Sequence, residues 1–101
     1  MAELIWTDRA IASLESIYDY IAADSAQYAQ HQINHILIRA ERLKIFPESG
    51  RHIPELPHLP HRELIVGAFR LIYRYDSSNE RVYIINVLHG RQLLTDVMFA
   101  G

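Results

Sequence analysis

Apolar side chains in the first part of the chain recur at helical spacing. The first set follows a short apolar stretch at residues 4–6 and consists of Ile11, Leu14, Ile17, Tyr18 and Ile21. Because polar residues lie between them, the pattern predicts an amphipathic helix over roughly residues 8–23. Thr7 and Asp8 stand where the N-cap of such a helix belongs, so residues 4–6 are predicted to form a strand that ends at the cap.

A second helix is predicted directly after the first. Asp24 and Gln27 have the spacing of a capping box at its start. Its inner stripe consists of Tyr28, Ile33, Ile36, Leu37, Ala40 and Leu43. We expect the helix to stop at residues 46–50, which include Pro47 and Gly50. Because the connection between the two helices is very short, an antiparallel helical hairpin is the economical arrangement.

The apolar period changes from helical to alternating in the second half. All four prolines fall within residues 47–61, which we predict to be a loop that wraps the domain. Alternating patterns follow at 62–66, 69–75 and 81–88, joined by short turns, so these strands must pair antiparallel. The order β-α-α-β-β-β predicts an α+β fold, with the N-terminal strand and a two-helix hairpin packed on a small, mainly antiparallel sheet.

Strand alternation predicts which side chains share a face of this sheet. In the second strand of the series, one face carries Phe69, Leu71, Tyr73 and Tyr75, and the other carries Arg70, Ile72 and Arg74. In the last strand, one face carries Tyr83, Ile85, Val87, His89 and Arg91, and the other carries Val82, Ile84, Asn86 and Leu88. Both faces of the last strand are therefore apolar in the middle. Either it is a central strand packed on both sides, or a partner chain covers one face.

Composition narrows the class of protein. With 101 residues, half of them hydrophobic and 22% charged, we expect one domain over residues 1–101 rather than a disordered chain. No cysteine is present, which excludes disulfides, thiolate metal sites and a cysteine nucleophile. No apolar run approaches the roughly 20 residues of a membrane helix, and the N-terminus lacks the features of a secretory signal. We therefore expect a soluble cytoplasmic protein without a cofactor.

The charge pattern favours specific binding through arginine side chains over a general affinity for nucleic acid. The formal net charge is −2, which is too acidic for a protein that binds nucleic acid by charge alone. Lys44 is the single lysine, so the basic groups of the second half are all arginines. Planar, bidentate guanidiniums suit carboxylates and phosphates equally, and the pattern does not choose between them.

One histidine pair has the spacing of metal ligands. His31 and His35 are four positions apart on the second predicted helix. The residue after His31 is Gln32 rather than the glutamate of a metalloprotease helix, and no third ligand is evident in the sequence. We interpret both as solvated helix histidines and predict no metal site.

Four short motifs occur in a fixed order along the second half. They are Pro-x-x-Gly-Arg at 47–51, Arg-Glu-Leu at 62–64, Arg-x-x-Tyr-Arg at 70–74 and His-Gly-Arg at 89–91. In this order and spacing they resemble the RelE/ParE superfamily of toxins from type II toxin–antitoxin modules, and most closely its ParE branch. The resemblance implies a growth-arresting, plasmid-stabilisation-like toxin that a cognate antitoxin holds inactive in a hetero-oligomer.

The resemblance leaves two targets open, since fold alone does not decide function. ParE-like members are taken to inhibit DNA gyrase without breaking bonds, whereas RelE-like members cut mRNA on the ribosome. We interpret the chain as a gyrase inhibitor. The alternatives are a ribosome-dependent mRNA endonuclease and an inactive relative that only binds its antitoxin.

The two targets assign different roles to the same side chains. For target or antitoxin binding, the candidate residues are Arg51, Arg70, Arg74, His89 and Arg91. For a nuclease, which needs proton transfer and cations for the developing charge, they are Arg62, Arg70 and His89. A third interpretation of Arg70 is an ordinary ion pair with Glu63 on the neighbouring strand.

Overall fold

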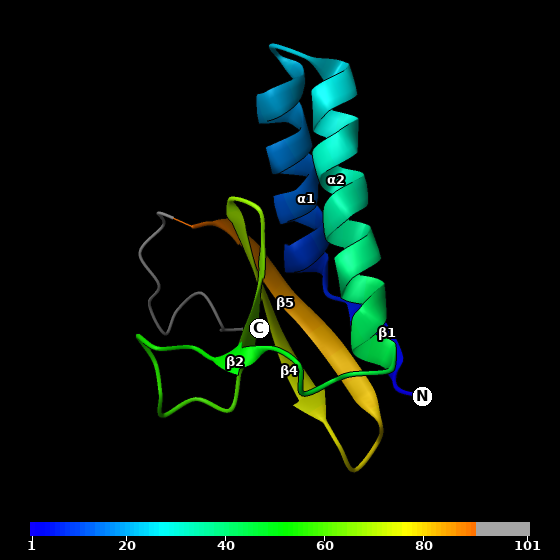
Figure 1. The fold of residues 1–101 in the computed structure, drawn as a ribbon, viewed down its shortest axis with the longest axis vertical. Helices are drawn as coiled ribbons and strands as arrows, with labels where there is room; N and C mark the ends of the chain where they lie inside the picture. The colour runs from blue at the N-terminus through cyan, green and yellow to red at the C-terminus, as the bar shows by residue number, and fades with distance from the viewer. Residues whose placement is uncertain (91–101) are drawn as a thin grey trace.

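The computed structural model describes residues 1–90 as an α+β fold, in agreement with the sequence-based prediction. Its elements are β1 (Glu3–Trp6), α1 (Asp8–Ala22), α2 (Ala26–Glu41), the 3-10 helix η1 (Arg42–Lys44), β2 (Arg51–His52), β3 (Arg62–Val66), β4 (Phe69–Asp76) and β5 (Arg81–His89). The two helices stand side by side and rise past the end of the sheet (Figure 1). Within residues 1–90, no helix is long and apolar enough to cross a membrane.

Side-chain caps fix both helix starts. The Thr7 hydroxyl accepts a hydrogen bond from the backbone N–H of Ala10 at 3.2 Å, as the sequence predicts. The cap of α2 is Ser25 rather than Asp24, because the Ser25 hydroxyl accepts from the Tyr28 N–H at 3.1 Å. The predicted capping box at Asp24 is therefore wrong. The Asp24 N–H donates to the carbonyl of Ile21, so Asp24 belongs to the turn that follows α1.

The sheet has five strands in the order β1-β5-β4-β3-β2. β1 pairs parallel with β5, and all other pairs are antiparallel. The sequence does not predict β2, since its two residues are too few to show alternation and prolines follow them closely. β2 nevertheless attaches the start of the proline-rich loop to the edge of β3, where Arg51 pairs with Glu63.

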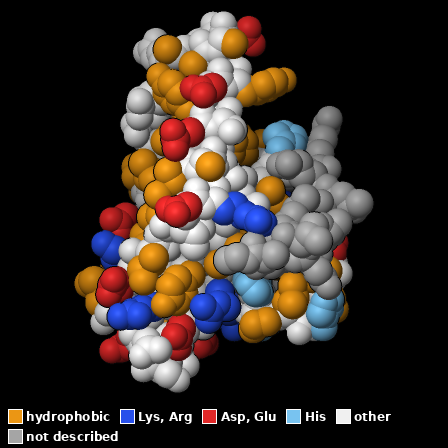
Figure 2. Space-filling view, turned by 180° about the vertical axis from the view of Figure 1, so that it is seen from behind, with side chains coloured by type: hydrophobic (Ala, Val, Ile, Leu, Met, Phe, Trp, Pro, Cys, Tyr) orange, Lys and Arg blue, Asp and Glu red, His pale blue; other side chains and the backbone are white. Residues whose placement is uncertain are grey.

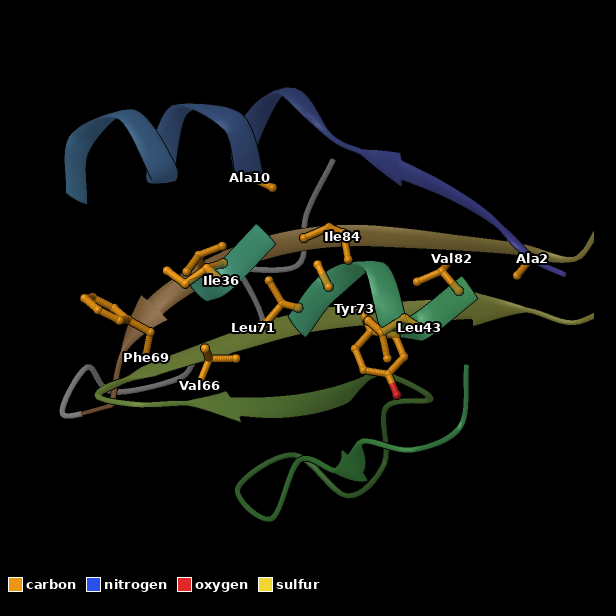
Figure 3. Close-up of a cluster of buried hydrophobic side chains, with 12 residues drawn as sticks. Ala2, Ala10, Ile36, Leu43, Val66, Phe69, Leu71, Tyr73, Val82 and Ile84 are labelled. Atoms are coloured by element: carbon orange, nitrogen blue, oxygen red, sulfur yellow. The ribbon is translucent and has the colours of Figure 1, made fainter. Parts of the chain in front are cut away.

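Two apolar clusters lie on opposite faces of the sheet. The helix-side cluster is the main core and contains Ala2, Ala10, Ile36, Ala40, Leu43, Val66, Phe69, Leu71, Tyr73, Val82, Ile84 and Val87 (Figure 3). The outer cluster contains Ile53, Ile72, Ile85 and Leu88, with Leu56 and Tyr83 packed against it. Because Ile53 and Leu56 belong to the proline-rich loop, the chain itself supplies cover for the outer face. Of the two explanations for the doubly apolar last strand, packing on both sides within one chain is the one observed.

A β-bulge corrects the predicted alternation of β5. Ile72 pairs with Asn86 while Tyr73 pairs with Ile84, so Ile85 is an extra residue in the ladder. The extra residue reverses the alternation beyond it. Val87 therefore packs in the helix-side cluster, not on the face of Tyr83 where strict alternation places it.

Candidate functional site

The Pro-x-x-Gly-Arg motif positions the first arginine of the site. The buried N–H of Gly50 donates a hydrogen bond of 2.8 Å to the hydroxyl of Tyr73 on β4. A Cβ at Gly50 would lie 2.6 Å from the Glu63 carbonyl oxygen and 2.7 Å from the Tyr73 ring, so only glycine fits this approach. Arg51 follows directly and enters β2, which places its side chain beside Glu63.

Two guanidiniums and two carboxylates form an ion-pair network on the outer face. We call it the Arg70 cluster, and its members are Arg51, Glu55, Glu63 and Arg70. Glu63 accepts from Arg51 Nε at 2.7 Å and from Arg70 Nε at 3.0 Å, and it also contacts Arg70 Nη2. Glu55 binds the other edge of the same guanidinium, at 2.7 Å to Nη1 and 3.0 Å to Nη2.

Burial differs sharply within the cluster. The Glu63 side chain is fully buried and that of Arg70 is 9% exposed, whereas those of Glu55 and Arg51 are 40% and 64% exposed. A buried carboxylate requires paired charge and hydrogen bonds, and the two arginines supply both. The Arg70 hydrogen bond holds the pKa of Glu55 below its ordinary value, and the same bond raises the pKa of Arg70.

The cluster borders a groove at the end of the sheet where β3 turns into β4. Arg51, Glu55 and Arg70 line it together with Phe69 and His89. The exposed ring of His89 packs edge-on against Phe69, with 6.0 Å between the ring centroids. Three of the predicted binding residues, Arg51, Arg70 and His89, are therefore brought to one site.

The remaining predicted residues lie elsewhere. Arg62 is on the helix side of β3, where its Nη1 donates to the Gly50 carbonyl at 2.9 Å. The Arg74 guanidinium carbon lies 4.8 Å from the centroid of the Tyr83 ring, in cation–π geometry. Arg91 lies outside the described residues. The nuclease trio is thus not assembled. Arg62 lies on the opposite face of the sheet from Arg70, and it pairs with Tyr73, four positions along β4 from the Phe69 that pairs with His89.

Glu55 is the member of the site that sequence reasoning missed. The predicted pairing of Arg70 with Glu63 is present in the structure. Glu55 lies in the proline-rich loop, and no periodic pattern relates a loop residue to a strand residue fifteen positions away. The sequence offers one signal for this contact: Glu55 stands between Pro54 and Leu56 in a loop that we expect to wrap the domain.

The two i, i+4 histidines occupy an open helix face. His31 and His35 are both exposed on α2. Among residues 1–90, no group of three or more His, Cys, Asp or Glu side chains gathers as a metal site would require.

Positive charge is absent from the projecting end of the helical hairpin. No Lys or Arg occurs between Arg9 and Arg39, while Glu15, Asp19 and Asp24 fall in that interval. From behind, the visible Lys and Arg side chains lie in the lower half of the molecule (Figure 2). Tyr20 on this projecting end is 84% exposed. The hairpin tip is therefore an acidic surface with an exposed aromatic side chain.

Comparison with known proteins identifies the family. Residues 4–94 match the family model described as ParE toxin of type II toxin-antitoxin system, parDE. Toxin RelE2 of Caulobacter vibrioides (strain ATCC 19089 / CIP 103742 / CB 15) is 36% identical over 93 residues, which are 92% of this chain and 100% of that protein. The chain belongs to the ParE toxin family, within the RelE/ParE superfamily of type II toxin–antitoxin systems.

Solved structures share the fold. A chain of the solved chromosomal ParDE TA system from P. aeruginosa gives a TM-score of 0.71 at 23% identity, covering 88% of this chain and 96% of that one. A free mutant of E. coli toxin RelE gives a TM-score of 0.63 at 16% identity, covering 90% and 86%. Both ParE-like and RelE-like structures therefore match, as expected for a fold that the two branches share.

Proposed function

We propose that this toxin inhibits DNA gyrase by binding it, without bond-breaking chemistry of its own. The observation that carries the proposal is the state of Arg70, whose guanidinium makes four hydrogen bonds to two carboxylates. An arginine side chain has five N–H donors. Arg70 is therefore occupied as a structural residue, and little of it is left for a phosphate.

Ribonuclease chemistry on this face would need cationic groups for the charge that develops on the phosphate. The Arg70 cluster contains two positive and two negative side chains, so its formal charge is zero. The observation that favours the endonuclease alternative is His89, an exposed titratable group beside the same groove. One histidine beside a neutral cluster supplies proton transfer but no net positive charge, so we favour the binding function.

The projecting hairpin supports a protein target. Its charged side chains are acidic, which disfavours contact with an RNA backbone. Exposed tyrosines are common in protein interfaces, and Tyr20 and Tyr28 are both exposed here. We place the gyrase contact on the hairpin tip and on the groove of Arg51 and His89.

A cognate antitoxin is the second proposed partner. A groove between the end of α2 and the sheet is lined by Arg39, Arg42, Phe46, Leu64 and Tyr75, among others. Phe46 is 55% exposed although it is aromatic. An antitoxin segment with apolar and acidic side chains would cover this surface and pair with both arginines.

Expression in cells tests the proposal. The toxin is induced with and without its antitoxin, and plasmid topology is followed together with the 5′ ends of cellular mRNA. We expect relaxed or broken plasmid with unchanged mRNA ends, and normal topology when the antitoxin is present. New mRNA ends inside codons, with plasmid topology unchanged, would assign the endonuclease function instead.

A further inference from the structure

Glu55 is not needed to neutralise the buried part of the Arg70 cluster. Glu63 already lies against Arg70 through Nε and Nη2, and it is the fully buried partner. Glu55 binds the outward edge of the guanidinium and is 40% exposed. Its carboxylate therefore sits where a ligand from solvent would approach.

The contact between Glu55 and Arg70 has the geometry of ligand recognition. Each oxygen of Glu55 pairs with a different terminal nitrogen of the guanidinium, at 2.7 and 3.0 Å. This two-point arrangement is the one by which arginine binds carboxylates and phosphates in general. A phosphate has oxygens at suitable spacing to take the same two donors.

The loop that carries Glu55 has its own anchors. Ile53 is fully buried in the outer cluster and Leu56 packs against it. The Leu56 N–H donates to the Ile53 carbonyl at 3.1 Å, which closes a turn around Pro54 and Glu55. The loop position therefore does not depend on the Glu55 carboxylate, and the tether keeps that carboxylate at a high effective concentration beside Arg70.

We propose that Arg70 forms an oxyanion-binding site on the outer face, and that Glu55 is its internal ligand and excludes phosphate from it. Arg51 and His89 line the same groove and add donors for a bound anion. Replacing Glu55 with a neutral residue changes the formal charge of the cluster from zero to +1. The site is then both open and positively charged.

The inference is separate from the identity of the cellular target. The proposed site concerns only the outward edge of the Arg70 guanidinium, which Glu55 occupies. If the toxin cuts mRNA, the proposed function fails whatever the phosphate result. If E55A shows no phosphate binding while the toxin inhibits gyrase, only the inference fails.

Phosphate titration of the purified full chain tests it. The probe is inorganic phosphate in a phosphate-free buffer at constant ionic strength, and the readout is the Nε–H NMR signal of Arg70. Glu55→Ala opens the site, and Glu55→Gln is the isosteric neutral variant. Glu15→Gln, which removes an exposed glutamate from α1, is the control for net charge.

We expect E55A and E55Q to bind phosphate at Arg70 with about tenfold higher affinity than the wild type, as follows from the loss of a charge-assisted competitor. E15Q should behave like the wild type. Equal affinity in all four proteins would overturn the proposal, and so would an Arg70 signal that phosphate never perturbs. Folding of each variant is checked by the dispersion of its amide spectrum.

Discussion

The backbone N–H of Gly50 donates a 2.8 Å hydrogen bond to the buried hydroxyl of Tyr73. This bond joins the Pro-x-x-Gly-Arg motif to the Arg-x-x-Tyr-Arg strand, across 23 positions of sequence. It also fixes where the following residue, Arg51, enters the sheet beside Glu63. Two of the motifs that define the resemblance are thus parts of one structural unit, and this unit supports the candidate site.

Gly50→Ala tests the close approach at this bond. Its Cβ would lie 2.6 Å from a backbone oxygen of β3, which a flexible side chain cannot relieve. We expect the free energy of unfolding to fall by about 1–3 kcal/mol, the usual cost of overpacking. Urea denaturation measures it, with Ser49→Ala at the exposed neighbouring position as the control. A G50A protein as stable as the wild type would contradict the packing described.

Tyr73→Phe tests the hydrogen bond itself. The substitution leaves the buried Gly50 N–H without its acceptor, which costs about 1–3 kcal/mol in the free energy of unfolding. Tyr20→Phe is the matched control, because the Tyr20 side chain is 84% exposed. Thermal and urea unfolding should separate the two variants clearly. If both lose the same stability, the hydroxyl of Tyr73 has no special role.

The ion pair between Glu63 and Arg70 should show strong coupling. Removing Glu63 leaves Arg70 with only its partly exposed partner Glu55, and removing Arg70 leaves the fully buried Glu63 with Arg51 alone. Each change leaves buried hydrogen-bonding groups unpaired, at a cost of about 1–3 kcal/mol. We expect Glu63→Gln and Arg70→Met each to destabilise strongly, and the double variant to lose much less than their sum. A double-mutant cycle by urea denaturation measures the coupling, and simple additivity would refute it. An Arg70 variant that loses toxicity is therefore expected to have lost stability, and its phenotype alone is not evidence for a catalytic role of Arg70.

Glu55 should make stability depend on pH in the acidic range. Arg70 holds the pKa of Glu55 below its ordinary value of 4.5. A lowered pKa means that the folded state favours the charged carboxylate, so this contribution is present above the unfolded value and is lost as the pH falls through the lowered one. The stability difference between the wild type and E55Q should be constant above about pH 5.5 and shrink below about pH 4.5.

Unfolding of both proteins across this range measures the difference, with E15Q as the control. A difference that grows on acidification would show that Glu55 is not held in its charged form by Arg70.

The sequence predicts the architecture well because periodicity reports burial directly. In the predicted stripe of the second helix, Ile36, Ala40 and Leu43 are buried in the core as expected, whereas Tyr28 and Leu37 are exposed and their assignment to the stripe is wrong. β4 places Leu71 and Tyr73 on the helix side, as its alternation predicts. The alternation fails only after Ile85, because one extra residue in a ladder leaves no mark in a pattern of apolar residues.

The candidate site is less predictable because it depends on contacts between distant positions. The pairing of Arg70 with Glu63 follows from adjacent strands and was open to prediction. The pairing with Glu55 depends on the path of a proline-rich loop, which no period specifies. β2, which begins at Arg51, is unpredictable for the same reason, because it forms only where the loop approaches β3.

Purified toxin, freed from its antitoxin, gives the most direct test of the gyrase proposal. One reaction contains gyrase and relaxed plasmid, and a parallel reaction contains programmed ribosomes with a labelled message. The proposal predicts that the toxin stops supercoiling or traps broken DNA while the message stays intact. Cleaved message with normal supercoiling would contradict it.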